Sequence, residues 1–360
     1  MKIHLSELAL AREYHAHTPF EELTPEQLRL MSEHAQRLHK WVNDHPGVHH
    51  TISFAVVVFL LLSDCAVLLW LPAAFMRHGH SGVSWMEVAG AVVVGSLHSL
   101  LIYSMMVYSL HEGAAHKRIF RPRGPVTRAF AMWANNLCRL GAADPVYYSK
   151  NHFSHHSQFG TAEDGEFLNF VSSRRYWPTM LPFAMFLNYS DFVVHRPLFI
   201  TKALLRSMAV SLVYHGIYAG AMLALYGAAF PFIALMVVTP HVGFFVDRLR
   251  HFSEHNLMPL DHRNGARSFG LGFWGMLIGG GPWGQPCHLI HHMFPAVPWY
   301  AQLMLHRKLK PVLTGRQREQ FLLRPVIGFP LLYFRLLREP HRFAESAAHA
   351  ATDESIPAGI

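Results

Sequence analysis

The sequence TISFAVVVFLLLSDCAVLLWLPAAF at residues 51–75 is a long apolar run whose main interruption is Asp64. A helix needs about 20 consecutive apolar residues to cross the hydrocarbon core of a bilayer. The run therefore predicts a membrane-spanning helix at residues 52–75.

Three further runs, at residues 88–110, 208–226 and 228–246, contain no Lys, Arg, Asp or Glu. Together with the first run they form two adjacent pairs, which argues against buried helices of a soluble protein. The apolar run at 178–189 is only twelve residues long, which suits the interface or a folded core better than a span. We predict an all-α integral membrane protein with about four transmembrane helices in two hairpins and a cytosolic helical cap.

The composition agrees with a membrane protein. Hydrophobic residues make up 51% of the chain and charged residues 15%, against about 25% charged residues in ordinary soluble domains. Three scattered cysteines exclude a disulfide scaffold.

The Lys and Arg residues are distributed unevenly along the chain. The turn at 76–87 holds Arg77 alone and the turn near Gly227 holds none, whereas the other 30 of 31 lie before the first run, at 111–207 or after Val246. By the positive-inside rule these three regions and both termini are cytoplasmic. The basic side chains that give the chain its net charge of +8 then face anionic lipid or an acidic redox partner. No basic stripe interleaved with aromatic residues supports a nucleic-acid partner.

The chain divides into three predicted regions. Residues 1–50 are polar and form a cytosolic N-terminal helical arm, in which Thr24 caps a helix and Pro25 takes its first position. Residues 51–345 form the membrane domain. Residues 346–360 form a disordered tail.

Histidine is unusually frequent, with 28 residues against 23 for Asp and Glu together. Four histidine boxes lie beyond the predicted spans, and the predicted topology places all of them on the cytosolic face. They are HEGAAH (111–116), HFSHH (152–156), HFSEH (251–255) and HLIHH (288–292). The candidate metal ligands are His111, His116, His152, His155, His156, His251, His255, His288, His291 and His292.

The spacing within the boxes suits metal binding. In HxxHH, positions i, i+3 and i+4 share one helix face, and so do His251 and His255. His111 and His116 are five residues apart and do not align on a regular helix, so they require a helix end, a bulge or rotation of the rings. The other interpretation is that these histidines cap helices or fill the core.

Ten imidazoles suffice for two metal ions with about five ligands each. Imidazole binds Fe, Cu, Zn and Ni, but a single zinc site needs only three or four ligands. Soluble di-iron bundles use carboxylates. The all-histidine set in a membrane protein favours an iron pair that activates O₂.

The boxes resemble those of the membrane fatty-acid desaturase superfamily, which includes alkane hydroxylases and carotenoid hydroxylases and ketolases. The resemblance covers roughly residues 88–309. His111-Glu112-x-x-x-His116 is similar to the HxxxxH box, the two HxxHH motifs match the second and last boxes, and HHMFPAVPWY (291–300) is similar to the HHxxPxVPxY continuation. In HFSEH, His251 occupies a position where the family has Asn, so His251 is either a direct ligand or lies outside the ligand shell. DHRNGARS (261–268) resembles a segment of bacterial desaturase-like oxygenases and carotenoid ketolases.

The resemblance implies a non-haem di-iron oxidoreductase that uses O₂ and external electrons to desaturate a fatty-acyl chain. Glu112 and Glu254 adjoin ligands and either fix ring tautomers from outside the ligand shell or are solvated or capping carboxylates. Hydroxylation or ketolation of a carotenoid, alkane or other lipid by the same site is the alternative. A membrane zinc hydrolase and a metal transporter are more remote alternatives.

Two motifs resemble cofactor-binding motifs but lack residues that those motifs require. His45-Pro46-Gly47 lacks the second glycine of a cytochrome b5 haem motif, so electrons must come from a separate ferredoxin or cytochrome b5 type donor. GLGFWG at 270–275 lacks the preceding strand and following acidic residue of a dinucleotide site.

Four ionisable residues lie within the predicted spans: Asp64, His98, His215 and His241. Either a functional role or an interhelical hydrogen bond would explain them.

Overall fold

The computed structural model describes residues 20–75, 84–116, 145–161, 202–227, 229–255 and 258–323, and the single residues 119, 125, 129 and 164. Within these residues the chain is helical, and one isolated bridge joins Ser268 and Leu322. The predicted all-α class is therefore confirmed for the described part of the chain. The short apolar run at 178–189 and the tail at 346–360 lie outside it.

Three continuous helical segments are long and apolar enough to cross a membrane: Pro46–Ala74, Trp85–Ala115 and Ala229–His255. They consist of α3 (Pro46–Leu69) with η1 (Leu71–Ala74), α4 (Trp85–Met106) with η2 (Val107–Ala115), and α10 (Ala229–Pro231) with η4 (Phe232–Val238) and α11 (Thr239–His255). They correspond to the predicted spans at 52–75, 88–110 and 228–246. The chain is thus a membrane protein by the length and composition of these helices.

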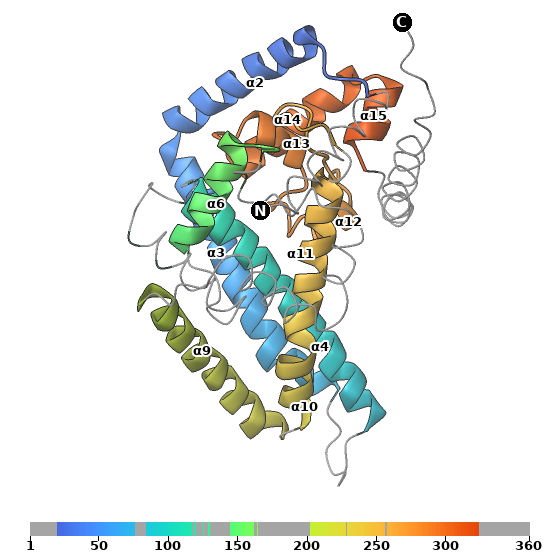
Figure 1. Cartoon of the computed structure of the whole chain (residues 1–360). Helices are drawn as coiled ribbons and strands as arrows, with labels where there is room; N and C mark the ends of the chain where they lie inside the picture. The colour runs from blue at the N-terminus through green and yellow to red at the C-terminus, as the bar shows by residue number, and fades with distance from the viewer. Residues whose placement is uncertain are drawn as a thin grey trace, which may run out of the picture.

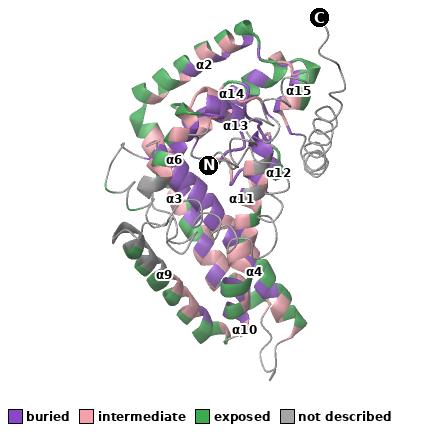
Figure 2. Cartoon of the chain, in the orientation of Figure 1, coloured by how far each residue is buried: buried purple, intermediate pink, exposed green. Residues whose placement is uncertain are grey.

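The predicted fourth span at 208–226 falls within helix α9 (Lys202–Tyr226), which is 25 residues long. Helix α9 contacts α3 and α10, and its apolar side chains Leu212, Val213 and Ile217 are exposed. Figure 2 shows exposed positions, in green, along α9. Exposed leucine, valine and isoleucine are compatible with lipid contact. A membrane-spanning role for α9, and with it the layout of two hairpins, stays a prediction.

Small residues allow α4 and the segment from η4 to α11 to approach closely. A Cβ added at Gly95 would lie 2.5 Å from the carbonyl oxygen of Ala234, and one added at Gly243 would lie 2.7 Å from the carbonyl oxygen of Ser99. The backbone N–H of Gly243 donates to Ser99 Oγ at 2.6 Å. Glycine and serine at such contacts are typical of helix packing in membranes.

The remaining described helices gather at one end of the three long segments, together with the C-terminal ends of η2 and α11 (Figure 1). They are α2 (Pro25–Asp44), α6 (Pro145–Ser157), α12 (Phe273–Ile278), α13 (His288–Met293), α14 (Trp299–Val312) and α15 (Gly315–Phe321). We call this part of the molecule the helical cap.

Helix α2 begins as the sequence predicts. Thr24 Oγ1 accepts from the N–H of Gln27, Gln27 Oε1 accepts from the N–H of Thr24, and Pro25 occupies the first turn. Met31 and Ala35 of α2 are buried in one apolar core with residues of α13, α14 and α15. This packing holds α2 against the other helices of the cap.

Candidate metal centre

The first histidine box lies on the π-helical segment η2, at the end of a membrane-spanning helix. The N–H of His116 donates to the carbonyl oxygen of His111 at 3.0 Å, an i to i+5 bond. This wider turn brings the two rings together, with centroids 4.6 Å apart, where a regular helix would separate them. The predicted departure from regular helix is confirmed, and π-bulges are frequent at functional sites.

Five imidazoles are linked by close contacts between their Nε2 atoms, and we call this group cluster one. The donor atoms of four of them, His111, His116, His152 and His291, all lie within 4.8 Å of one another. His116 Nε2 lies 2.9 Å from His152 Nε2, and His156 Nε2 lies 3.1 Å from the same atom. His291 Nε2 lies 2.9 Å from His156 Nε2 and 3.1 Å from His111 Nε2. Cluster one thus joins residues from η2, α6 and α13.

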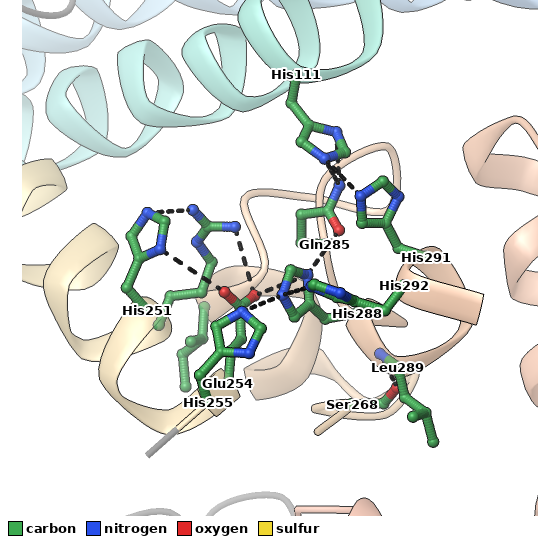
Figure 3. Close-up of polar contacts among 12 residues, drawn as sticks. His111, His251, Glu254, His255, Ser268, Gln285, His288, Leu289, His291 and His292 are labelled. Atoms are coloured by element: carbon green, nitrogen blue, oxygen red, sulfur yellow. Dashed lines mark hydrogen bonds and ion pairs between the residues drawn. The ribbon is translucent and has the colours of Figure 1, made fainter. Parts of the chain in front are cut away.

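Four other imidazoles form cluster two, also through Nε2. His288 Nε2 lies 2.9 Å from His255 Nε2 and 3.0 Å from His292 Nε2. His292 Nε2 lies 3.3 Å from His155 Nε2. All four side chains are buried, and Figure 3 shows His255, His288 and His292 grouped at the end of α11 and on α13.

Each HxxHH box contributes to both clusters. In α6, His152 and His156, one helical turn apart, belong to cluster one, whereas His155 belongs to cluster two. In α13 the roles are reversed, because His288 and His292 belong to cluster two and His291 to cluster one. The three imidazoles on the shared helix face of a box therefore do not enter the same cluster, because adjacent histidines in a helix point about 100° apart.

The protonation of cluster two is set by hydrogen-bond acceptors. His255 Nδ1 donates to the carbonyl oxygen of Gly265 at 2.9 Å, and His288 Nδ1 donates to Gln285 Oε1 at 3.0 Å. A neutral imidazole carries one proton, so the Nε2 atoms of both rings present lone pairs to each other at 2.9 Å. Two buried lone pairs at this distance repel each other unless both bind the same cation.

His155 has the same arrangement with a carboxylate. Its Nδ1 lies 3.0 Å from Asp164 Oδ1 and 3.2 Å from Asp164 Oδ2, and the N–H of Gly160 donates to Asp164 Oδ2 at 3.0 Å. A carboxylate on Nδ1 fixes the tautomer and makes Nε2 a stronger metal ligand. Asp164 was not predicted from the sequence, because nothing in its position eight residues after the second box distinguishes it from a solvated acid.

The spacing of the nitrogen atoms fits metal binding. Two imidazole nitrogens bound to one ion at the usual metal–nitrogen distance and at right angles lie about 3 Å apart. The closest Nε2 separations in both clusters fall between 2.9 and 3.3 Å. The residues present therefore fit two metal ions, one in each cluster.

Burial keeps the three imidazoles of the last box in the form that binds metal. The pKa values of His288, His291 and His292 are well below that of an ordinary histidine, first because the rings are buried and then because other imidazoles surround them. Metal ligands must be deprotonated, so the site is prepared for a cation at neutral pH.

The two predicted tautomer-fixing glutamates occupy different positions. Glu112 Oε1 lies 3.1 Å from His111 Nδ1. Glu254 Oε1 lies 3.5 Å from His288 Nδ1 and also accepts from Arg250 at 3.4 Å. Both carboxylates are buried beside predicted ligands, although their effect on the tautomers remains a prediction.

His251 is the one predicted ligand that the structure brings to neither cluster. Its Nε2 lies 2.7 Å from Arg250 Nη2 and 3.3 Å from Asp247 Oδ1, and Figure 3 shows it on the opposite side of Glu254 from His288. The buried charges of Arg250 and Asp247 hold the ring one turn before His255. We therefore leave His251 out of the proposed ligand set.

A small cavity lies beside cluster one. Its lining includes Leu110, His111, Tyr148, Arg250 and His251. His251 and the predicted ligand His111 thus line the same cavity.

His262 was not among the predicted ligands but lies at the site. Its Nε2 is 3.2 Å from His156 Nδ1, and its donor atom lies within 4.8 Å of those of His156 and His292. Burial, with a smaller effect of His155, lowers its pKa. The only sequence signal was its place in DHRNGARS, the segment that resembles other oxygenases.

The fold and site together define a membrane protein with two adjacent histidine clusters at one end of its spanning helices. The model of the fatty acid desaturase family matches residues 83–323, about two thirds of the chain. The chain therefore belongs to the fatty acid desaturase family, as the resemblance of the boxes predicted. No curated protein matches it. Membership of this family implies an oxidoreductase with a lipid substrate.

Proposed function

We propose that this protein is an O₂-dependent di-iron membrane oxidoreductase that introduces a double bond into a fatty-acyl chain of a lipid or thioester. The observation that carries the proposal is the pair of Nε2 clusters. Five imidazoles lie in cluster one and four in cluster two, with Nε2 separations that suit two ions. The family match supports the oxidoreductase class and the lipid substrate.

The side chains around the clusters prepare the ligands. Gly265, Gln285 and Asp164 hold the Nδ1 protons of His255, His288 and His155, so that each Nε2 lone pair faces the cluster. Burial lowers the pKa values of His288, His291 and His292 and so favours their neutral, metal-binding form. Two irons bound there would activate O₂ and remove hydrogen from an unactivated C–H bond.

Hydroxylation or ketolation of a carotenoid, alkane or other lipid is the second candidate function. It requires the same metal site, and the similarity of DHRNGARS (261–268) to segments of such oxygenases favours it. The two reactions differ in their products. A desaturated lipid is lighter by two hydrogen atoms, and a hydroxylated lipid is heavier by one oxygen atom.

The remote alternatives fit the site less well. A zinc hydrolase needs three or four ligands in one site, whereas nine imidazoles are grouped here in two. A metal transporter places its ligands near the bilayer midplane, whereas these clusters adjoin the ends of the spanning segments, at His111–His116 and His255.

The electron donor is proposed to be a separate ferredoxin or cytochrome b5 type protein on the cytoplasmic side, where the positive-inside rule also places both termini. In the described part of the cap, exposed basic side chains lie on α14 and α15. They are Arg307, Lys308, Lys310, Arg316 and Arg318. Such a surface attracts an acidic partner and speeds its association.

The function is tested by expressing the protein in a host and comparing total lipids by mass spectrometry with those of a host that expresses His155→Ala. Purified wild-type protein is analysed for metals in parallel. Two irons per chain and a new lipid lighter by two hydrogen atoms support the proposal. Stoichiometric zinc with iron near zero would contradict the di-iron assignment, and a lipid heavier by one oxygen atom would favour hydroxylation.

A further inference from the structure

One short loop contacts predicted ligands of both clusters. The loop follows α11, and Asp261 shapes its turn by accepting from the N–H groups of Arg263 and Asn264 at 2.8 and 2.9 Å. Asn264 Oδ1 in turn accepts from the N–H of Leu23, which ties the loop to the N-terminal arm. Gly265 in this loop accepts from His255 of cluster two.

His262 occupies the same loop and faces cluster one. Its Nε2 lies 3.2 Å from His156 Nδ1. Its ring packs near the edge of Phe159, with centroids 6.1 Å apart. The loop that orients one predicted ligand through Gly265 is thus also in position to orient another through His262.

The position of His156 determines what His262 can do. His156 Nε2 lies 3.1 Å from His152 Nε2 and 2.9 Å from His291 Nε2, two members of cluster one. If that nitrogen binds a metal, its lone pair is used and the single proton of the ring must be on Nδ1. That proton then points at the Nε2 atom of His262.

We propose that His262 is a positioning residue, which accepts the Nδ1–H of His156 through Nε2 and so fixes the tautomer and ring orientation of that ligand. The proposal rests on the ligand set of the proposed function. It gives His262 toward His156 the role that Asp164 has toward His155 and Gly265 has toward His255. Loss of such partners of metal-bound histidines typically weakens metal binding about 10- to 100-fold.

The test compares two substitutions in the full-length protein in detergent. His262→Phe keeps an aromatic ring but removes the acceptor, whereas the amide oxygen of His262→Gln can still accept a hydrogen bond. His34→Phe, at a half-buried histidine of α2, is the matched control for the loss of an imidazole. Each protein is loaded with ⁵⁷Fe(II), and iron affinity is measured by chelator competition and the two iron environments by Mössbauer spectroscopy.

In His262→Phe we expect one iron to bind about 10- to 100-fold more weakly and its Mössbauer signal to change, while the other signal is retained. His262→Gln and His34→Phe should resemble the wild type. Unchanged affinity and spectrum in His262→Phe would overturn the proposal, and so would a His262→Gln protein as defective as His262→Phe. If His262→Phe does not accumulate, His262→Ala repeats the comparison without added bulk. Wild-type protein that binds no iron would instead contradict the proposed function on which the inference rests.

Discussion

The imidazole of His155 and the carboxylate of Asp164 form a fully buried pair, with Nδ1 and Oδ1 3.0 Å apart. A buried carboxylate is costly unless it is hydrogen-bonded or paired, and here it accepts from His155 and from the backbone of Gly160. The pair therefore connects the loop after α6 to cluster two.

We expect Asp164→Ala to weaken iron binding to cluster two by about 10- to 100-fold, because His155 loses the acceptor that fixes its tautomer. Asp164→Asn should be less severe, because its amide oxygen can still accept from Nδ1. Iron content of the purified proteins after dialysis against a chelator measures both effects. Asp44→Ala, at an exposed acid of α2, is the control. Equal iron retention in Asp164→Ala and Asp44→Ala would contradict this role.

His251 and His255 lie one turn apart on α11 but have different surroundings. We expect His255→Gln to lose iron from cluster two, because the Nε2 of His255 lies 2.9 Å from that of His288. His251→Gln should retain both irons, because His251 contacts Arg250 and Asp247 and belongs to neither cluster. Metal analysis of the two variants, purified identically, distinguishes them. Loss of one iron from His251→Gln would restore His251 to the ligand set.

Arg250 is buried between two acids, with Nη2 3.2 Å from Asp247 Oδ1 and Nη1 3.4 Å from Glu254 Oε1. Arg250→Met leaves these carboxylates without their cation, and breaking a buried ion pair in this way costs about 3–5 kcal/mol. We therefore expect a clear fall in the thermal unfolding temperature of the protein in detergent.

Arg29→Met is the matched control for that substitution, because Arg29 makes an exposed i,i+4 ion pair with Glu33. Exposed pairs contribute at most about 1 kcal/mol, so its unfolding temperature should stay close to that of the wild type. Similar shifts of the unfolding temperature in both variants would show that the buried ion pairs of Arg250 add nothing to the stability of the fold.

His306 of α14 is buried, and its Nδ1 has no hydrogen-bond partner within the described residues. Burial, helped by the charge of Lys310, lowers its pKa to about 4. The unfolded chain therefore binds this proton at a higher pH than the folded protein does. The contribution of neutral His306 to the free energy of unfolding is fully present above about pH 6.5. It is lost as the pH falls toward 4.

His306→Leu removes this dependence on pH. Between pH 7.5 and pH 4.5 the variant should lose less of its unfolding free energy than the wild type, by about 3 kcal/mol at most. Thermal unfolding of both proteins across this range tests it. Parallel curves for wild type and variant would show that His306 does not titrate differently on folding.

The sequence predicted the features that depend on local chemistry. Length and apolar composition identified the segments at 52–75, 88–110 and 228–246, because a span must be continuous in sequence. The cap of α2 at Thr24 and Pro25 followed from neighbouring residues. The spacing of His111 and His116 required a departure from regular helix, and η2 provides one.

Other features depend on residues far apart in the chain, and the sequence alone did not reveal them. His262 and Asp164 resemble ordinary polar loop residues until folding places them against His156 and His155. The division of each HxxHH box between two clusters likewise depends on which rings meet across α6 and α13.

The sequence by itself determined that this is a helical membrane protein of the fatty acid desaturase family with clustered histidines, because hydropathy and motif spacing are properties of contiguous residues. Only the tertiary structure decided which nitrogen atoms share a site. That depends on how η2, α6, α11 and α13 pack, and a turn of α11 separates His255 in cluster two from His251 among the charges of Arg250 and Asp247.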